Sequence, residues 1–168
     1  MGKLGIARRG LAPVVGNAGE YLVAGELLRR GVLAALTPKN SPGFDILATD
    51  RKKTVSIRVK TKLGASAWQW NAQSGDWRAK VFKERTREDF TILVDLARID
   101  EAPSFYVVPT RKLEKYLQKK HKEWVETPGT RVKKRSLENK RRMLFEHSRF
   151  FKRIARNNWR DLGLRFSI

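Results

Sequence analysis

The stretch 17–62 constrains the fold most, because its apolar residues first follow the spacing of a helix and then that of β-strands. Its first part has apolar residues at helical spacing, namely Tyr21, Ala24, Leu27 and Leu28. Its second part contains three short runs, at 32–36, 44–47 and 54–62, that are typical of β-strands and are separated by polar turns. The pattern therefore predicts one helix followed by three strands.

The ends of this helix are indicated by two residues. Asn17 is a favourable N-cap, and Gly31 stands where a glycine commonly ends a helix. Residues 1–16, with four glycines and a proline, are predicted to form a flexible lead-in. Glu20 follows Asn17 at the spacing of a capping box. One interpretation is therefore that its carboxylate accepts a hydrogen bond from the main-chain amide at the helix N-terminus.

The third predicted strand carries an unusual row of polar side chains. Period-two alternation places Ser56, Arg58, Lys60 and Lys62 on one face. A solvated strand face is the simplest interpretation of such a charge run. Asp45, which follows a turn, has an equally simple interpretation as a hydrogen-bond acceptor for its own loop.

Taken in order, these segments resemble the PD-(D/E)XK nuclease superfamily, and most of all its small bacterial proteins and resolvases. The motifs are Gly-x-x-Gly-Glu ending at Glu20, Gly-Phe-Asp-Ile around Asp45, and Ile-x-Val-Lys-Thr around Lys60. The resemblance covers about the first 110 residues. It implies an α/β fold of the restriction-endonuclease-like sandwich type, with a central mixed sheet flanked by helices.

The resemblance also implies roles for individual residues. Glu20, Asp45 and Lys60 would be catalytic: Asp45 and Glu20 would bind Mg²⁺ or Mn²⁺, and Lys60 would orient or activate the attacking water. The superfamily has Glu, Asp or Gln two residues before this lysine, where the chain has Arg58. A guanidinium has no lone pair for a metal ion and repels it.

Arg58 therefore leaves two functions open. The first is a metal-dependent endonuclease that hydrolyses phosphodiester bonds. The second is a nuclease-like protein that has lost its chemistry, in which Arg58 clamps a phosphate and the chain binds nucleic acid without cutting it. A basic adaptor in a larger assembly, with no organised cleft, is a third possibility.

Charge predicts the class of partner. The formal net charge of +20 indicates a polyanion, and we expect nucleic acid, DNA before RNA, rather than a membrane. Residues 111–168 carry 19 basic and 6 acidic residues, so most of the excess lies there. The absence of cysteine excludes thiolate catalysis and a disulfide framework. No signal peptide or long apolar run is apparent, and we expect a cytoplasmic protein, with a homodimer as one alternative for its oligomeric state.

The remaining elements are predicted from shorter patterns. Segments 67–71 and 77–81 are expected to form an aromatic hairpin whose tryptophans cover the sheet or, as a less favoured alternative, stack on bases. Apolar strands are expected at 90–96 and 104–108, followed by a helix at 111–124. The division of the chain is then a nuclease-like domain at 17–124 and a basic extension at 125–168 packed on it.

That extension is predicted to be largely helical over 137–157, with one face docked and the other facing phosphates. Trp159, Leu162, Leu164 and Phe166 are expected to anchor the tail. Together with two residues of the third strand, the extension supplies the predicted nucleic-acid contacts: Arg58, Lys62, Lys133, Lys134, Arg135, Lys140, Arg141, Arg142, Arg149, Lys152, Arg153 and Arg156.

Overall fold

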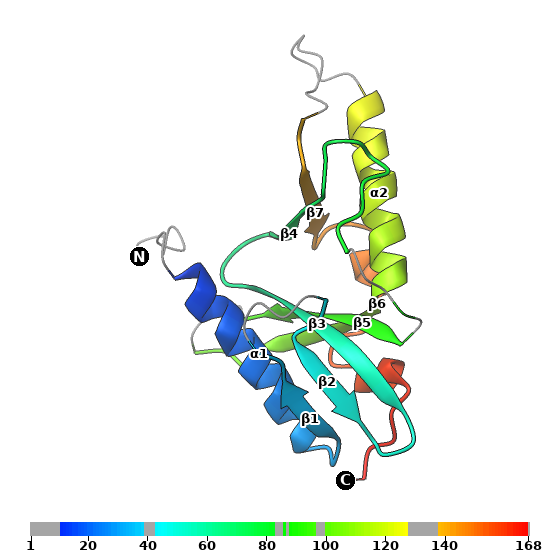
Figure 1. Cartoon of the computed structure of the whole chain (residues 1–168). Coiled ribbons are helices and arrows are strands. Elements are labelled where there is room, and N and C mark those ends of the chain that lie inside the picture. The colour runs from blue at the N-terminus through cyan, green and yellow to red at the C-terminus, as the bar shows by residue number, and fades with distance from the viewer. Residues whose placement is uncertain are drawn as a thin grey trace.

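The centre of the protein is a five-stranded mixed sheet in the order β1-β2-β3-β5-β6 (Figure 1). The computed structural model describes residues 11–38, 43–82, 86, 88–96, 100–127 and 138–167. Strands β3 and β5 are parallel, and the other neighbours are antiparallel. All five strands of this sheet were predicted from the sequence: β1 (Leu33–Leu36), β2 (Ile46–Thr49), β3 (Thr54–Lys62), β5 (Asp89–Asp95) and β6 (Ser104–Pro109).

The first helix, α1 (Ala12–Leu28), is longer than the sequence predicted. Its predicted start at Asn17 is wrong, because the helix begins at Ala12 with Pro13 in its first turn, where a missing N–H costs nothing. Residues 12–16, predicted to be a flexible lead-in, are therefore helical. The predicted end is confirmed by Gly31, whose φ of 78° is a left-handed conformation that glycine adopts without strain.

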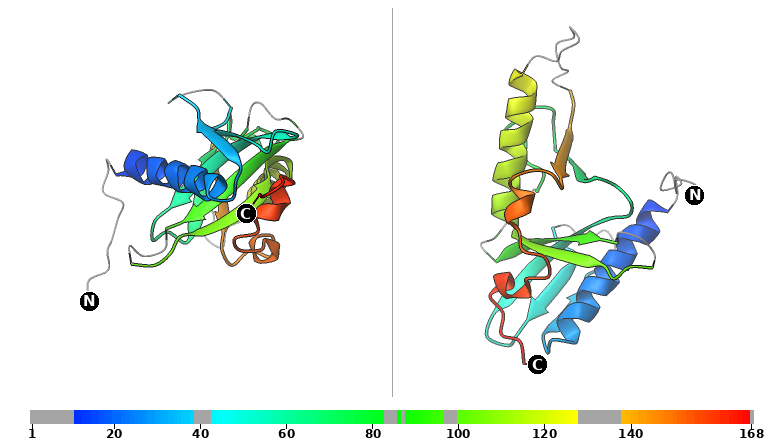
Figure 2. Two further views of the ribbon diagram at one scale, coloured as in Figure 1. Left: turned by 90° about the horizontal axis from the view of Figure 1, so that it is seen from below. Right: turned by 180° about the vertical axis from the view of Figure 1, so that it is seen from behind.

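One face of the sheet is covered by α1, as the two views of Figure 2 show. Val23, Ala24 and Leu27 are buried against apolar side chains of the strands. The predicted apolar stripe is only partly correct, since Tyr21 and Leu28 are 66% and 51% exposed. The inner and outer faces of α1 are therefore both apolar, and the sequence pattern alone did not distinguish them.

The other face of the sheet supports a second layer that rises away from it (Figure 1). This layer contains α2 (Thr110–Glu126) and a two-stranded sheet of β4 (Ala67–Asn71) with β7 (Arg141–Phe145). Its core joins side chains of β5 and β6 to others from all three elements. The predicted helix at 111–124 is confirmed by α2.

Two predictions about this layer are wrong. The segment 67–71 pairs with β7, 70 to 78 residues away in sequence, and not with 77–81. The predicted basic helix at 137–157 is replaced by β7, turns and the short 3-10 helix η1 (Phe151–Arg153). Alternation along β7 buries Arg142 and Leu144, a period of two that frequent basic residues obscured. Residues 128–137 lie outside the described part of the chain.

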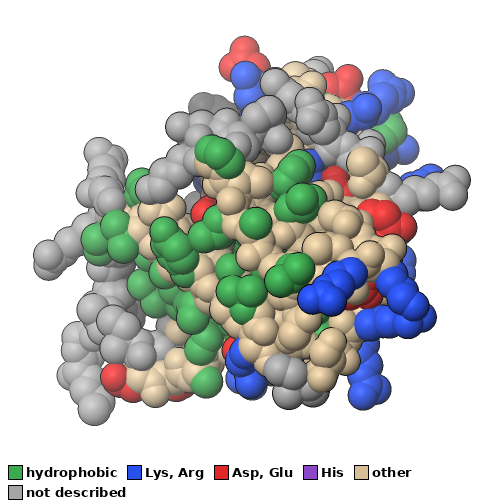
Figure 3. All heavy atoms as spheres, turned by 60° about the horizontal axis from the view of Figure 1, so that its bottom comes forward, with side chains coloured by type: hydrophobic (Ala, Val, Ile, Leu, Met, Phe, Trp, Pro, Cys, Tyr) green, Lys and Arg blue, Asp and Glu red, His purple; other side chains and the backbone are tan. Residues whose placement is uncertain are grey.

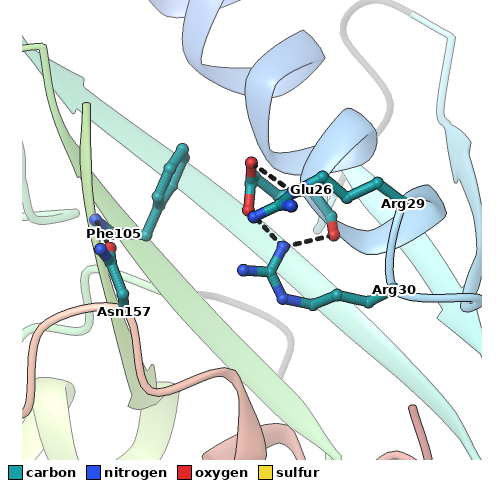
Figure 4. A network of polar contacts seen from close by, with 5 residues as sticks. All are labelled: Glu26, Arg29, Arg30, Phe105 and Asn157. Atoms are coloured by element: carbon teal, nitrogen blue, oxygen red, sulfur yellow. Dashed lines mark hydrogen bonds and ion pairs between the residues drawn. The ribbon is translucent and has the colours of Figure 1, made fainter. Parts of the chain in front are cut away.

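The C-terminal tail packs on the first core, as predicted. Trp159, in the 3-10 helix η2 (Trp159–Leu162), is buried there with Leu162 and Leu164. Asn157 exchanges hydrogen bonds with the main chain of Phe105, whose amide donates to Asn157 Oδ1 at 3.0 Å. Figure 4 shows this contact facing the end of α1, where Arg29 and Arg30 both pair with Glu26.

The crossing of α1 over β3 requires a glycine. A Cβ at Gly19 would lie 1.8 Å from Thr61 Oγ1, whereas a Cβ at Gly16 of the same helix would meet nothing within 4 Å. We expect Gly19→Ala to lower the free energy of unfolding by about 1–3 kcal/mol through overpacking. Gly16→Ala is the matched control and should raise it by about 0.5–1 kcal/mol, since alanine favours the helix.

Urea denaturation of both variants measures these changes. The double variant Gly19→Ala/Thr61→Ala removes the clashing hydroxyl and should recover part of the loss. Equal effects of Gly16→Ala and Gly19→Ala would contradict a close crossing.

Candidate active site

The candidate site lies on the polar face of β3, opposite α1. Asp45 immediately precedes β2, and its amide donates to Ile57 O of β3 at 2.9 Å. Its carboxylate accepts a 2.7 Å hydrogen bond from the Val59 amide, through Oδ2. Asp45 is thus attached to the neighbouring strand and not to its own loop, which contradicts the simpler interpretation of this residue.

Burial raises the pKa of Asp45 above its usual range. The hydrogen bond from Val59 and the positive charges of Arg58 and Lys60 lower it, but they do not outweigh the loss of water. Asp45 is therefore a carboxylate held in an environment that disfavours its own negative charge. A cation bound beside this carboxylate would oppose the shift.

Lys60 lies within electrostatic range of this carboxylate. Burial lowers its pKa, and the charge of Asp45 partly opposes that effect. Its Nζ lies 6.0 Å from the ring centroid of Trp70. A solvated lysine face is therefore the wrong interpretation of β3. The structure places Asp45, just before β2, within electrostatic range of Lys60 in β3.

Arg58 is held by a residue that sequence reasoning missed. Its guanidinium forms an ion pair with Asp89 at the start of β5, and the two side chains are 13% and 3% exposed. Ser56 Oγ donates to the other oxygen of Asp89 at 2.8 Å. The ring of Phe82 lies 5.5 Å from the guanidinium carbon. The sequence contains no signal for this pair, because the parallel β3–β5 register is set by tertiary structure.

Glu20 lies in the middle of α1, half-buried and one residue after the crossing at Gly19. Its capping-box interpretation is wrong, because α1 begins at Ala12, so Glu20 is not in its first turn. Thr61, the residue that Gly19 contacts, is next to Lys60 in β3. Because side chains alternate along a strand, Thr61 and Lys60 point to opposite faces of β3, so this contact does not bring Glu20 to Asp45, and the metal-binding role of Glu20 stays a prediction.

Lys62 has a structural environment. Its side chain is 5% exposed, pairs with Asp95 at 2.6 Å and with Glu146, and lies 4.7 Å from the ring of Trp68. The predicted nucleic-acid contact at Lys62 is therefore not supported, because the side chain is almost fully buried and its ammonium already pairs with two carboxylates. Trp68 is itself 1% exposed, which agrees with the favoured prediction that tryptophans cover the sheet.

Arg142 is a second predicted nucleic-acid contact that the structure does not support. It is 2% exposed and donates to four main-chain carbonyls, the nearest being Asp76 O at 2.8 Å. Its function is to hold the turn at 74–76 against β7.

Other predicted contacts have different environments. The following side chains are exposed: Lys140, Arg141, Arg149, Lys152, Arg153 and Arg156. Lys133, Lys134 and Arg135 lie outside the described residues.

A hollow of about 540 Å³ lies elsewhere, between α2 and β7. Trp124, His121 and Arg141 are among its lining residues, whereas Asp45 and Lys60 are not. The candidate active site is therefore defined by its charged groups and not by this hollow.

Comparison with known proteins finds similarity in structure alone. No family model and no curated protein matches the chain. The structure is similar to a bacterial homing endonuclease, I-Ssp6803I, with 16% identity, a TM-score of 0.47, and coverage of 64% of this chain and 74% of that one. It is also similar to the Holliday junction resolvase Hjc of Archaeoglobus fulgidus, with 14% identity, a TM-score of 0.49, and coverage of 90% and 98%.

With both TM-scores below 0.5, these similarities assign no superfamily to the chain, and the resemblance to PD-(D/E)XK nucleases stays a prediction. At these identities the likeness concerns the arrangement of the chain and does not assign an activity. Within the described ranges, no helix is long and apolar enough to span a membrane.

The donor set for a metal ion is small. Among the described residues, no three His, Cys, Asp or Glu side chains lie close enough to hold one ion together. Asp45 offers one carboxylate, and Mg²⁺ commonly binds through one or two carboxylates, with water and substrate phosphate as its other ligands. The residues therefore fit an open site that a phosphate completes, and do not fit a closed metal cage.

The pKa of Asp45 leads to a test of its environment. A carboxyl group whose folded pKa is raised stabilises the fold at low pH, and this contribution is lost as the pH rises through the folded pKa. Asp45→Asn keeps an acceptor for Val59 and should raise the free energy of unfolding at pH 7, by about 1 kcal/mol. Below the ordinary Asp pKa of about 3.9, the gain should disappear.

Asp50→Asn is the control with the opposite sign. Main-chain amides of Arg165 and Lys53 lower the pKa of Asp50 to about 2, so its carboxylate stabilises the fold at neutral pH, and this contribution is lost as the pH falls towards 2. Asp50→Asn should therefore be destabilising at pH 7. Denaturation curves at several pH values measure both effects, and a loss of stability for Asp45→Asn at pH 7 would contradict the assignment.

Proposed function

We propose that the protein is a metal-dependent endonuclease of nucleic acid, with DNA a better substrate than RNA. The observation that carries this proposal is the placement of Asp45 and Lys60 on one face of the sheet, in mutual electrostatic range and both partly desolvated. Catalytic acids and bases need pKa values displaced from their ordinary ranges, and burial with a charged neighbour is how proteins displace them. The net charge of +20 supports a polyanionic substrate.

In this proposal Asp45 binds Mg²⁺ or Mn²⁺, with Glu20 as the second protein oxygen donor. The ion would supply neutralisation of phosphate charge and a more acidic water. The protein residues have separate tasks. Val59 N–H fixes the orientation of the Asp45 carboxylate. Lys60 Nζ, with its lowered pKa, holds or accepts a proton of the attacking water and places positive charge beside the phosphate.

Arg58 is compatible with this chemistry because its charge is matched by Asp89. An unpaired guanidinium beside Asp45 would repel a metal ion at short range. The negative charge of Asp89 offsets part of the positive potential that Arg58 exerts at Asp45. Asp89 is in this view a positioning residue, which acts on the site through Arg58.

A second candidate function is binding of nucleic acid without cleavage. It is favoured by Arg58 at the position where the superfamily has a carboxylate or amide, and by the small donor set of the described residues. In this case Lys60 and Arg58 would contact a phosphate directly and no ion would be needed.

Cleavage assays separate the two candidates. Wild type, Asp45→Asn and Lys60→Met are incubated with plasmid, branched DNA and RNA, with Mg²⁺, Mn²⁺ or EDTA. We expect metal-dependent cutting by wild type and a loss of about 100-fold or more in each variant, as is typical for groups that act on the transition state. Binding is scored in parallel at two salt concentrations, because basic proteins bind nucleic acid at low salt whatever their chemistry.

Lys52→Met is the matched control, since Lys52 is an exposed lysine in the turn before β3. It should cut like wild type. Tight binding by wild type with no cutting of any substrate would reject the endonuclease and leave the binding function. Cutting in EDTA, or equal cutting by Lys60→Met, would reject the proposed roles.

The influence of Arg58 on metal affinity is testable without activity. Arg58→Gln alone leaves Asp89 buried without its cation, at a cost of about 3–5 kcal/mol. The double variant Arg58→Gln/Asp89→Asn removes both charges and should remain folded. We expect it to bind Mn²⁺ at least several-fold more tightly than wild type, as measured by electron paramagnetic resonance. Unchanged affinity would show that the Asp89 pair already cancels the effect of Arg58 on the metal.

A further inference from the structure

The outer face of α1 is apolar and uncovered. Val14, Tyr21 and Leu28 are 59%, 66% and 51% exposed, and Leu11, just before the helix, is 46% exposed. A helix that is apolar on all sides normally lies buried on all sides. In this chain the sheet covers just the inner face. Figure 3 shows hydrophobic side chains gathered over this side of the molecule, with Lys and Arg mostly at its margin.

Residues of this outer face follow a heptad. Intervals of three and four residues alternate through Leu11, Val14, Ala18, Tyr21, Gly25 and Leu28. This is the a/d pattern with which one helix packs along another. We call these six residues the outer seam. Within the described residues no other element packs on this seam, so it has room for a second helix.

The seam contains a glycine that the isolated chain does not require. A Cβ at Gly25 would meet nothing within 4 Å, and glycine inside a helix costs about 1 kcal/mol relative to alanine. Together with Ala18, Gly25 makes a shallow surface between larger side chains. Small residues at this spacing allow a second helix to approach closely.

The lack of positive charge on α1 argues against nucleic acid as the partner of the outer seam. The chain has 37 Lys and Arg, yet α1 contains none between Ala12 and Leu28. Its acidic residues are Glu20, which is half-buried, and Glu26, which pairs with Arg29 and Arg30. Nucleic acid has no ligand on this seam. Another copy of the same seam, apolar and without positive charge, is complementary to it.

We propose that the outer seam is a homodimer interface in which two α1 helices pack antiparallel across a two-fold axis. With the axis between Ala18 and Tyr21, the pairing places Ala18 against the other copy's Tyr21, Val14 against its Gly25, and Leu11 against its Leu28. Each small residue then faces a large one, which fills the interface. A parallel pair would place Gly25 on Gly25 and leave a gap.

This interface does not depend on the proposed nuclease activity. It lies on the helix face opposite the one that packs on the sheet, so two active sites would remain open in the dimer. An isologous contact of this kind closes on itself and limits the assembly to two chains. Because one helix pair is a small interface, we expect a dissociation constant on the order of micromolar.

The first test is the mass of the full chain in solution. Sedimentation equilibrium in high salt, after removal of nucleic acid, should give twice the chain mass of 19.4 kDa at high protein concentration. Leu28→Lys should weaken association by at least tenfold. Leu33→Lys is the matched control, because Leu33 is a leucine of similar exposure, 56%, on the edge strand β1. It should leave association unchanged.

The second test is crosslinking, for which the absence of cysteine is an advantage. The antiparallel pairing predicts that Ala18→Cys/Tyr21→Cys forms an intermolecular disulfide on mild oxidation, whereas Leu28→Cys alone does not. A monomeric wild type at all concentrations would overturn the proposal. So would dissociation by Leu33→Lys but not Leu28→Lys, which would move the interface to the sheet edge, or crosslinking of Leu28→Cys alone, which would make the helices parallel. Circular dichroism of each variant excludes unfolding as the cause.

Discussion

The structure depends on how β3 buries a polar face. This strand lies in the middle of the sheet, with α1 on one side, so its other side must also be covered. That side carries Arg58, Lys60 and Lys62, whose charges are costly to remove from water without partners. Each lies near an aromatic ring of the segment 68–82, and Arg58 and Lys62 also pair with carboxylates of β5. The parallel pairing of β3 with β5 is what brings those carboxylates into reach.

Lys60 differs from Arg58 and Lys62, which share its face of β3, in the acidic residue that lies near it. This difference indicates where the site is. Arg58 and Lys62 form ion pairs with Asp89 and Asp95 of β5, which compensate their buried charges. The acidic neighbour of Lys60 is Asp45, a residue outside the strands whose own pKa is raised. A pair in which burial disfavours both charges adds little to stability, and such pairs are commonly kept for chemistry. One strand therefore supplies two structural cations and one candidate catalytic cation.

Two regions of the protein suit two different kinds of partner. Most of the excess positive charge lies in residues 111–168, which suit a polyanion. The outer seam of α1 has no positive charge and suits another apolar helix. Gly19 and Gly25 lie on the same helix for opposite reasons: Gly19 allows contact with Thr61 inside the chain, and Gly25 leaves room for a contact outside it.

The sequence by itself determined the helix–strand order of 17–62, the strands β5 and β6, the helix α2 and the identity of Asp45 and Lys60 as candidate residues, because local periodicity and short motifs carry that information. It did not determine the partner of β4, since β7 is distant in the chain and its alternation was hidden among basic residues. Nor did it determine the partner of Arg58. Tertiary structure decided that Asp89 faces Arg58, that Lys62 and Arg142 are buried, and which side of α1 remains exposed, because each depends on strand register and packing between segments far apart in sequence.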